Sequence, residues 1–202
     1  MLYQFYESAH AAMKPMRVLS SMQRSLIENP LNPLGDCSFV KAYSASLQVF
    51  ERTTQQYVKP NWSIPDLSPP GKKVKMSRVL RLDFCDLLEF TIQPKGKRPK
   101  ILLVAPLSGH YATLLSGTVK SLVEDFDVYL TDWKDARDIP LYKGSFNFSS
   151  YVDYLLQFMK LIGSNYHLIA VCQPGPAALV ATAHAAQLKA NYNPKSLVLM
   201  GC

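Results

Sequence analysis

From residue 101 onward, apolar segments of strand length alternate with amphipathic segments of helix length. Strands are expected at residues 101–105, 126–130, 167–171 and 197–200, and apolar residues recur at helical spacing between them. The first of these strands is wholly apolar, which is typical of a strand buried on both faces. Parallel strands need long crossover connections, usually helices, so the alternation predicts a mostly parallel α/β sheet covered by helices on both faces.

Local signals add detail to this pattern. Two partly alternating strands are expected at residues 79–84 and 87–92, before the apolar strand. The helix that ends near residue 162 is expected to begin at Ser150, because Ser150 and Asp153 have the spacing of a capping box. An Ala-rich helix is expected to run to about Ala190.

The composition of the chain changes twice. Residues 1–58 carry apolar side chains at helical spacing, on faces that need a partner. Residues 59–75 are rich in proline and lysine, and residues 76–202 contain the expected strands. We therefore predict an N-terminal helical segment (1–58), a proline-rich basic linker (59–75) and an incomplete α/β-hydrolase-like core (76–202) that stops after the strand following the Ala-rich helix.

The net charge of +7 is unevenly placed. Residues 59–100 hold ten Lys or Arg against four Asp or Glu. Aromatic residues do not alternate with these cations, and no helix suited to a nucleic-acid groove accompanies them, so nucleic acid is not an expected partner. The favoured interpretation is a solvated linker and a basic turn at residues 95–100, and contact with an anionic surface is the alternative.

The chain has four cysteines, Cys37, Cys85, Cys172 and Cys202. Their spacing is wide, no C-x-x-C pair occurs and no histidine cluster accompanies them, so neither a zinc site, nor another metal centre, nor a disulfide framework is expected. A reducing, cytoplasmic location follows as the expectation, since the N-terminus lacks the features of a secretory signal. The uncharged stretch 161–188 is not expected to span a membrane, because the sequence Pro174-Gly175-Pro176 would interrupt a helix there.

Cys172 stands between an expected buried strand and the Ala-rich helix. This is the position of a nucleophile elbow, whose usual sequence is G-x-S-x-G, and here Ala170 and Pro174 occupy the positions of the glycines. The amide groups at the start of the helix favour a negative charge nearby, as in a thiolate. A buried structural cysteine is the competing interpretation, and the pentapeptide alone does not separate the two.

The loop after the strand at 101–105 would supply one oxyanion N–H, and the residue after the nucleophile the other. The candidate donors are therefore Gln173 together with Leu107 or Ser108. The catalytic base of such a fold normally follows the last strand. The histidines of this part of the chain are accordingly expected to be structural: His110, His167 and His184.

Four sequence blocks resemble the intracellular poly(3-hydroxybutyrate) depolymerases: Ala105–Leu115, Asp127–Arg137, Tyr151–Tyr154 and Val171–Pro174. The resemblance implies an α/β-hydrolase that cleaves the polyester of storage granules with cysteine in place of serine. Cys172 would attack the ester carbonyl and form an acyl-enzyme that water hydrolyses. No metal or organic cofactor is implied.

The resemblance also carries a departure. Chains of that family are about twice as long, and their catalytic Asp and His lie beyond the strand at 197–200. We therefore expect a truncated form with little activity alone, because a triad that lacks one member retains only residual activity. Residues 196–200 are expected to form an exposed apolar edge, open to pairing with another chain. A second polypeptide that supplies the missing half is one such partner.

Two other functions remain open. Polyester synthases also use a cysteine in a lipase-like box and transfer acyl groups, but they usually keep glycines around it, so Gln173 and Pro174 favour hydrolysis. The non-enzymatic alternative is a granule-binding remnant. It would use the aromatic N-terminal helices and the basic segment 72–100 at the granule surface.

Overall fold

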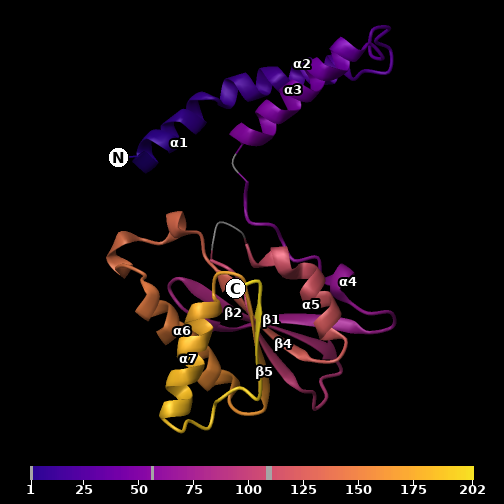
Figure 1. Cartoon of the computed structure of the whole chain (residues 1–202). Helices are drawn as coiled ribbons and strands as arrows, with labels where there is room; N and C mark the ends of the chain where they lie inside the picture. Colours follow the sequence, from indigo (N-terminus) through magenta and orange to yellow (C-terminus); the bar gives the residue numbers. More distant parts are fainter. Residues whose placement is uncertain (1, 56, 108–110) are drawn as a thin grey trace. The chain divides into compact units, whose positions relative to one another are not determined.

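The computed structural model describes residues 2–55, 57–107 and 111–202 (Figure 1). The chain forms two compact units, Met1–Lys59 and Pro60–Cys202. We describe each unit by itself. The boundaries predicted from composition, at residues 58 and 75, stay a prediction.

The first unit is helical, with α1 at Leu2–Ala12, α2 at Lys14–Ile27 and α3 at Ser38–Thr54. Pro15 lies in the first turn of α2, where its missing N–H costs no helical hydrogen bond. Helices α2 and α3 form an antiparallel hairpin (Figure 1).

Polar contacts join α2 to α3. Arg24 on α2 forms an ion pair of 3.2 Å with Glu51 on α3, and the Ser44 hydroxyl donates to the Glu28 carboxylate at 2.7 Å. Among residues 5–55 and 57–59, the buried side chains are His10, Ser20 and Ser44, and none is hydrophobic. Many large apolar side chains of this unit are exposed, whereas Ile27, Val40, Leu47 and Phe50 are half-buried.

The second unit is built on a six-stranded sheet of order β1-β2-β4-β3-β5-β6. Its strands are β1 Lys73–Arg81, β2 Cys85–Gln93, β3 Lys100–Val104, β4 Asp127–Trp133, β5 Tyr166–Val171 and β6 Leu197–Met200. Strands β4, β3, β5 and β6 pair in parallel, whereas β1 and β2 are antiparallel to their neighbours. The prediction of a mostly parallel α/β sheet is confirmed, with its two antiparallel strands at one side.

Helices cover both faces of this sheet. The short helix α4 (Ile64–Leu67) and α5 (Ser116–Val123) lie on one face, and α6 (Phe148–Ile162) and α7 (Gly175–Gln187) lie on the other (Figure 1). Three short 3₁₀ segments complete the connections, at Ala112–Leu115, Ala136–Asp138 and Leu141–Lys143.

Two local expectations need correction. The strand expected at 79–84 begins at Lys73, because β1 is a border strand whose outward positions can carry lysines. Helix α6 is capped by Asn147, whose side-chain oxygen accepts the Ser150 N–H at 2.9 Å, so the predicted cap at Ser150 is wrong. Asparagine is an equally good cap and stands three residues earlier.

The core lies in the middle of the sheet. From Ile101 to Val104, every side chain of β3 is at most 3% exposed, so burial on both faces is confirmed. Among the described strands, β6 pairs with β5 alone, and Val198, Leu199 and Met200 are each more than 40% exposed. The expected apolar edge is therefore present. No helix within the described ranges has the length and apolar character needed to cross a membrane.

Candidate nucleophile site

Cys172 lies on the turn between β5 and α7 with a φ of +64°. This left-handed conformation is uncommon for a residue with a Cβ, and it costs about 1–3 kcal/mol unless the surroundings enforce it. The Cys172 N–H donates to the Met200 carbonyl at 2.8 Å, and the Gly175 N–H donates to the Cys172 carbonyl at 3.2 Å. A strained strand-to-helix turn held in this way is the geometry of a nucleophile elbow.

The thiol of Cys172 belongs to an exposed residue. The interpretation as a buried structural cysteine is therefore wrong for Cys172. It describes Cys85 instead, which is fully buried on β2, and burial raises the pKa of the Cys85 thiol.

Gly175, rather than Ala170 or Pro174, is the position where the elbow needs a glycine. A Cβ built on Gly175 would lie 2.4 Å from the Cβ of Cys202 and 2.6 Å from its Sγ. The Cys202 side chain therefore occupies the space that a side chain at position 175 would need. The G-x-S-x-G pattern misses this glycine because it stands one position later in the chain.

The structure brings together two of the predicted oxyanion donors. The Leu107 N–H, in the loop after β3, donates to the Oε1 atom of Gln173 at 3.0 Å. Gln173 directly follows Cys172, so the loop is tied to the elbow itself. The other candidate from the loop, Ser108, and the neighbouring His110 lie outside the described residues.

The start of this loop is fixed by β4. The Ala105 N–H donates to the Thr131 hydroxyl at 2.9 Å, and the Trp133 indole N–H donates to the Ala105 carbonyl at 2.9 Å. Trp133 is itself buried and meets the Tyr151 ring edge-on, with ring centroids 4.6 Å apart. Three of the four blocks that resemble the depolymerases thus meet at one place. Sequence reasoning assigned no role to Thr131 or Trp133, although both belong to a block that it had singled out.

The described histidines of this unit lie far from Cys172. His167 is five residues earlier on β5, about 16 Å away along the strand, and its ring nitrogen Nδ1 lies 2.8 Å from the Ser196 hydroxyl. His184 lies nine residues into α7, about 13 Å from the start of that helix. Neither can act as the base for Cys172.

The described residues around the elbow form no metal centre. Within the described ranges, no group of three or more His, Cys, Asp or Glu side chains is placed to hold a metal ion.

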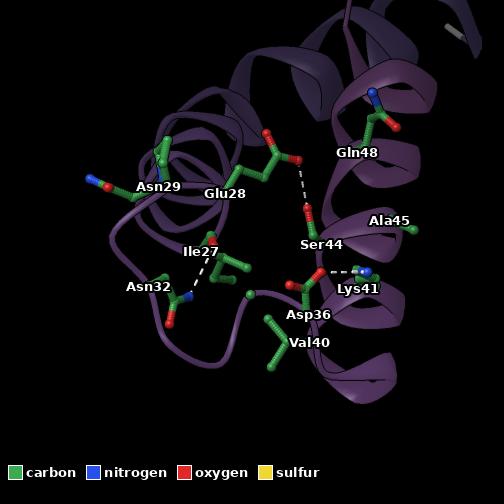
Figure 2. Close-up of a pocket in the computed structure, with 12 residues that line it drawn as sticks. Ile27, Glu28, Asn29, Asn32, Asp36, Val40, Lys41, Ser44, Ala45 and Gln48 are labelled. Carbon is green, nitrogen blue, oxygen red and sulfur yellow. Dashed lines mark hydrogen bonds and ion pairs between the residues drawn. The ribbon is translucent and has the colours of Figure 1, made fainter.

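A pocket of about 480 Å³ lies at the turn between α2 and α3 (Figure 2). Its charged groups are paired within it, with Lys41 on Asp36 at 2.9 Å and Ser44 on Glu28 at 2.7 Å. This pairing gives the pocket no evident chemical role.

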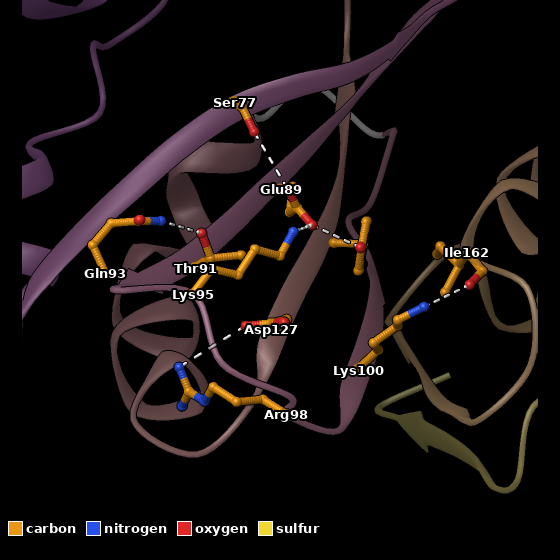
Figure 3. Close-up of polar contacts among 10 residues, drawn as sticks. Ser77, Glu89, Thr91, Gln93, Lys95, Arg98, Lys100, Asp127 and Ile162 are labelled. Carbon is orange, nitrogen blue, oxygen red and sulfur yellow. Dashed lines mark hydrogen bonds and ion pairs between the residues drawn. The ribbon is translucent and has the colours of Figure 1, made fainter.

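A buried polar network lies at the opposite end of the sheet, where the parallel strands begin (Figure 3). Glu89 on β2 accepts hydrogen bonds from Lys95 at 2.8 Å and from Tyr129 at 2.7 Å. Burial acts to raise the pKa of Glu89, but these hydrogen bonds outweigh it and hold the pKa below its ordinary value. Burial raises the pKa of Asp127, and Arg98, 4.0 Å away, offsets this only in part. This network is too far from the elbow to take part in its chemistry.

Comparisons with known proteins assign the chain to no family. No family model and no curated protein matches the chain. A solved structure of a membrane phospholipase A, a bacterial virulence factor, is similar over 77% of this chain and 44% of its own, with 19% identity and a TM-score of 0.48. A hydrolase from Pseudomonas aeruginosa PA01 is similar over 65% of this chain and 46% of its own, with 18% identity and a TM-score of 0.46.

The chain thus spans less than half the length of these structures. The fold class of the chain follows from its own architecture. A mostly parallel sheet, an elbow at the end of β5 and helices on both faces make the described core an α/β-hydrolase-like fold.

Proposed function

We propose that this chain carries the nucleophile part of a cysteine-type polyester depolymerase that hydrolyses polyhydroxyalkanoate esters. The observation that carries the proposal is Cys172, exposed on a strained turn at the carboxyl end of β5 and tied to the loop after β3. The resemblance of the four sequence blocks supplies the substrate class. Free thiols persist in a reducing cytoplasm, so this is where the enzyme would meet a storage granule.

The reaction assigned to Cys172 is acyl transfer followed by hydrolysis. The thiolate attacks the ester carbonyl carbon, a sulfur–carbon bond forms, and the alcohol end of the polymer leaves with a proton. Water then cleaves the thioester and regenerates the thiol. The N–H groups of Gln173 and of Leu107 or Ser108 would stabilise the oxyanion in both steps.

Turnover needs an acid and a base from outside the described residues, because His167 and His184 cannot reach Cys172. The apolar edge of β6 offers a place where further strands could pair and bring those groups to the elbow. We infer that Cys172 of the chain alone becomes acylated but that hydrolysis of the thioester, which releases the acyl group, is slow. A second polypeptide, or further chain, would restore release.

Acylation tests this proposal directly. The full chain is mixed with excess p-nitrophenyl 3-hydroxybutyrate, and a burst of about one equivalent of nitrophenolate is expected before a slow steady state. Mass spectrometry of peptides should place the acyl group on Cys172. The variant Cys172→Ala should lose the burst, whereas Cys202→Ala, which removes the other thiol near the elbow, should keep it.

A burst that survives in Cys172→Ala, or an acyl group found on another cysteine, would contradict the nucleophile assignment. Rapid and sustained hydrolysis of amorphous polyhydroxybutyrate by the chain alone would contradict the inferred need for further groups. Polymer formed from a hydroxyacyl-CoA would favour the acyltransferase alternative.

The second candidate function is binding to the granule surface through the helical unit, and one observation favours it. On α2 the apolar residues Met16, Leu19, Met22 and Leu26 are exposed, while Arg24 and Ser20 are turned inward. Helices that lie on an apolar surface have this distribution, with apolar side chains outward and flexible methionines among them.

Co-sedimentation with amorphous polyhydroxybutyrate granules checks this second function. Leu26→Glu should lower the bound fraction at least about fivefold, because a buried leucine contributes about 1.5–3 kcal/mol and a charge opposes burial. Ser25→Glu adds the same charge at the neighbouring exposed position and should bind almost normally. Equal losses in both variants would show that charge alone, rather than an apolar contact, decides binding.

A further inference from the structure

A hydrogen bond between residues 66 positions apart joins the loop after β3 to the elbow after β5, from the Leu107 N–H to Gln173 Oε1 at 3.0 Å. A backbone amide has one hydrogen and makes one strong hydrogen bond at a time. While this contact holds, the Leu107 N–H is not available to a substrate. Its acceptor is a neutral amide oxygen, which is chemically similar to an ester carbonyl oxygen.

The contact is not needed to hold the loop in place. Thr131 and Trp133 already fix Ala105, two residues before Leu107, from β4. Gln173 is exposed on the turn, and its long side chain has three rotatable bonds. The side chain can therefore leave without releasing the loop.

We propose that the Gln173 side chain is a displaceable plug of the oxyanion hole: it occupies the Leu107 N–H in the resting protein and leaves when the reacting carbonyl takes its place. This inference rests on the proposed function, since it assumes that Cys172 is acylated. On this proposal Gln173 has two roles. Its backbone N–H is an oxyanion donor, and its side chain acts indirectly, by controlling access to the Leu107 N–H.

Displacing the plug costs the bound ester and the transition state alike, but only the oxyanion recovers that cost. A neutral ester carbonyl is no better an acceptor than the Gln173 amide, so it gains little by displacing it. An oxyanion forms a charge-assisted hydrogen bond about twice as strong as a neutral one and displaces the amide readily. The plug therefore keeps the Leu107 N–H from tightening ester binding, and it slows acylation by the net free energy of one neutral hydrogen bond.

Two rates measured on the full chain separate this role from general thiol reactivity. Acylation by p-nitrophenyl 3-hydroxybutyrate passes through an oxyanion. In alkylation by iodoacetamide, the Cys172 sulfur displaces iodide from a carbon atom, and no oxyanion forms. Both are followed on the Cys172 peptide by mass spectrometry. The ratio of the two rate constants cancels differences in the amount of thiolate and reports on the oxyanion hole.

Removing the plug should raise this ratio. The ratio should rise about three- to tenfold in Gln173→Ala and in Gln173→Met, which keeps the length of the side chain. This factor corresponds to the net free energy of one neutral hydrogen bond. Alkylation should change less than twofold. Gln187→Ala removes an exposed glutamine at the end of α7 and should leave both rates unchanged.

Strengthening the plug should lower the ratio. Gln173→Glu has the same shape, its carboxylate binds the Leu107 N–H more strongly, and its charge repels an oxyanion, so the ratio should fall tenfold or more. An unchanged or lower ratio in both Gln173→Ala and Gln173→Met would overturn the plug. An absence of acyl groups on Cys172 in every variant, including the unaltered chain, would instead overturn the proposed function on which the plug rests.

Discussion

Replacing Trp133 with alanine is expected to lower the free energy of unfolding by about 3–5 kcal/mol, the range for a buried aromatic side chain. Trp133 is 3% exposed, and its ring contacts the rings of Phe146, Tyr151 and Tyr154. Its removal leaves a cavity in this aromatic cluster. It also leaves the Ala105 carbonyl without its indole partner.

Trp133→Phe separates packing from hydrogen bonding. Phenylalanine keeps an aromatic ring in the cluster but has no N–H, so the expected loss is about 1–3 kcal/mol, the cost of an unsatisfied buried acceptor with a small cavity. Because Ala105 begins the loop that carries Leu107, the ratio of Cys172 acylation to alkylation should also fall. Urea unfolding measures the first effect, and the two labelling rates measure the second.

Trp62→Phe is the matched control. Trp62 also packs edge-on against a phenylalanine, Phe90, with ring centroids 5.0 Å apart. Its indole N–H is buried and has no hydrogen-bond partner among the described residues, so removing that N–H should cost little. If Trp133→Phe were no more destabilising than Trp62→Phe, the hydrogen bond to Ala105 would have no structural importance.

The features that could be predicted from sequence are those with a local signal. The apolar run at Ile101–Val104 predicts a strand buried on both faces, and the place of Cys172 between a strand and an Ala-rich helix predicts an elbow. The start of β1 at Lys73 has no such signal, because a border strand tolerates lysines on its open side. At α6, two capping residues compete and Asn147 is the one used, which sequence spacing alone does not decide.

The contacts that define the site have no local signal. Trp133 donates to a carbonyl 28 positions away, and Gln173 accepts from an N–H 66 positions away. Such pairs depend on the order of strands in the sheet, where β4 and β5 lie on either side of β3. The sequence blocks that resemble the depolymerases include these segments, but they do not show which side chains meet. Only the three-dimensional structure assigns Trp133 to the loop and the Gln173 side chain to the Leu107 amide.

The second large effect is expected in the network of Figure 3, where two buried carboxylates should respond in opposite ways to neutralisation. Glu89→Gln should lower the free energy of unfolding at pH 7 by about 2 kcal/mol, because hydrogen bonds to a charged group contribute about 1.5–3 kcal/mol and Lys95 is partly exposed. Asp127→Asn should leave stability unchanged or raise it. Within the described part of the chain, the Oδ1 atom of Asp127 is buried without a hydrogen bond, and the Arg98 nitrogen that pairs with it is 4.0 Å away.

The pH dependence of the two variants follows from the directions of the pKa shifts. The pKa of Glu89 is lower in the folded protein than its ordinary value of 4.5, so the charged carboxyl stabilises the fold above that pH, and this stabilisation is lost as the pH falls below it. The pKa of Asp127 is raised above its ordinary 3.8, so the charged carboxyl destabilises the fold increasingly as the pH rises from that value. Urea unfolding between pH 3 and pH 7 should therefore show the deficit of Glu89→Gln shrinking in acid and the gain of Asp127→Asn growing toward neutral pH. A deficit in Glu89→Gln that stays constant down to pH 3 would mean that the side chain acts through its shape and not through its charge.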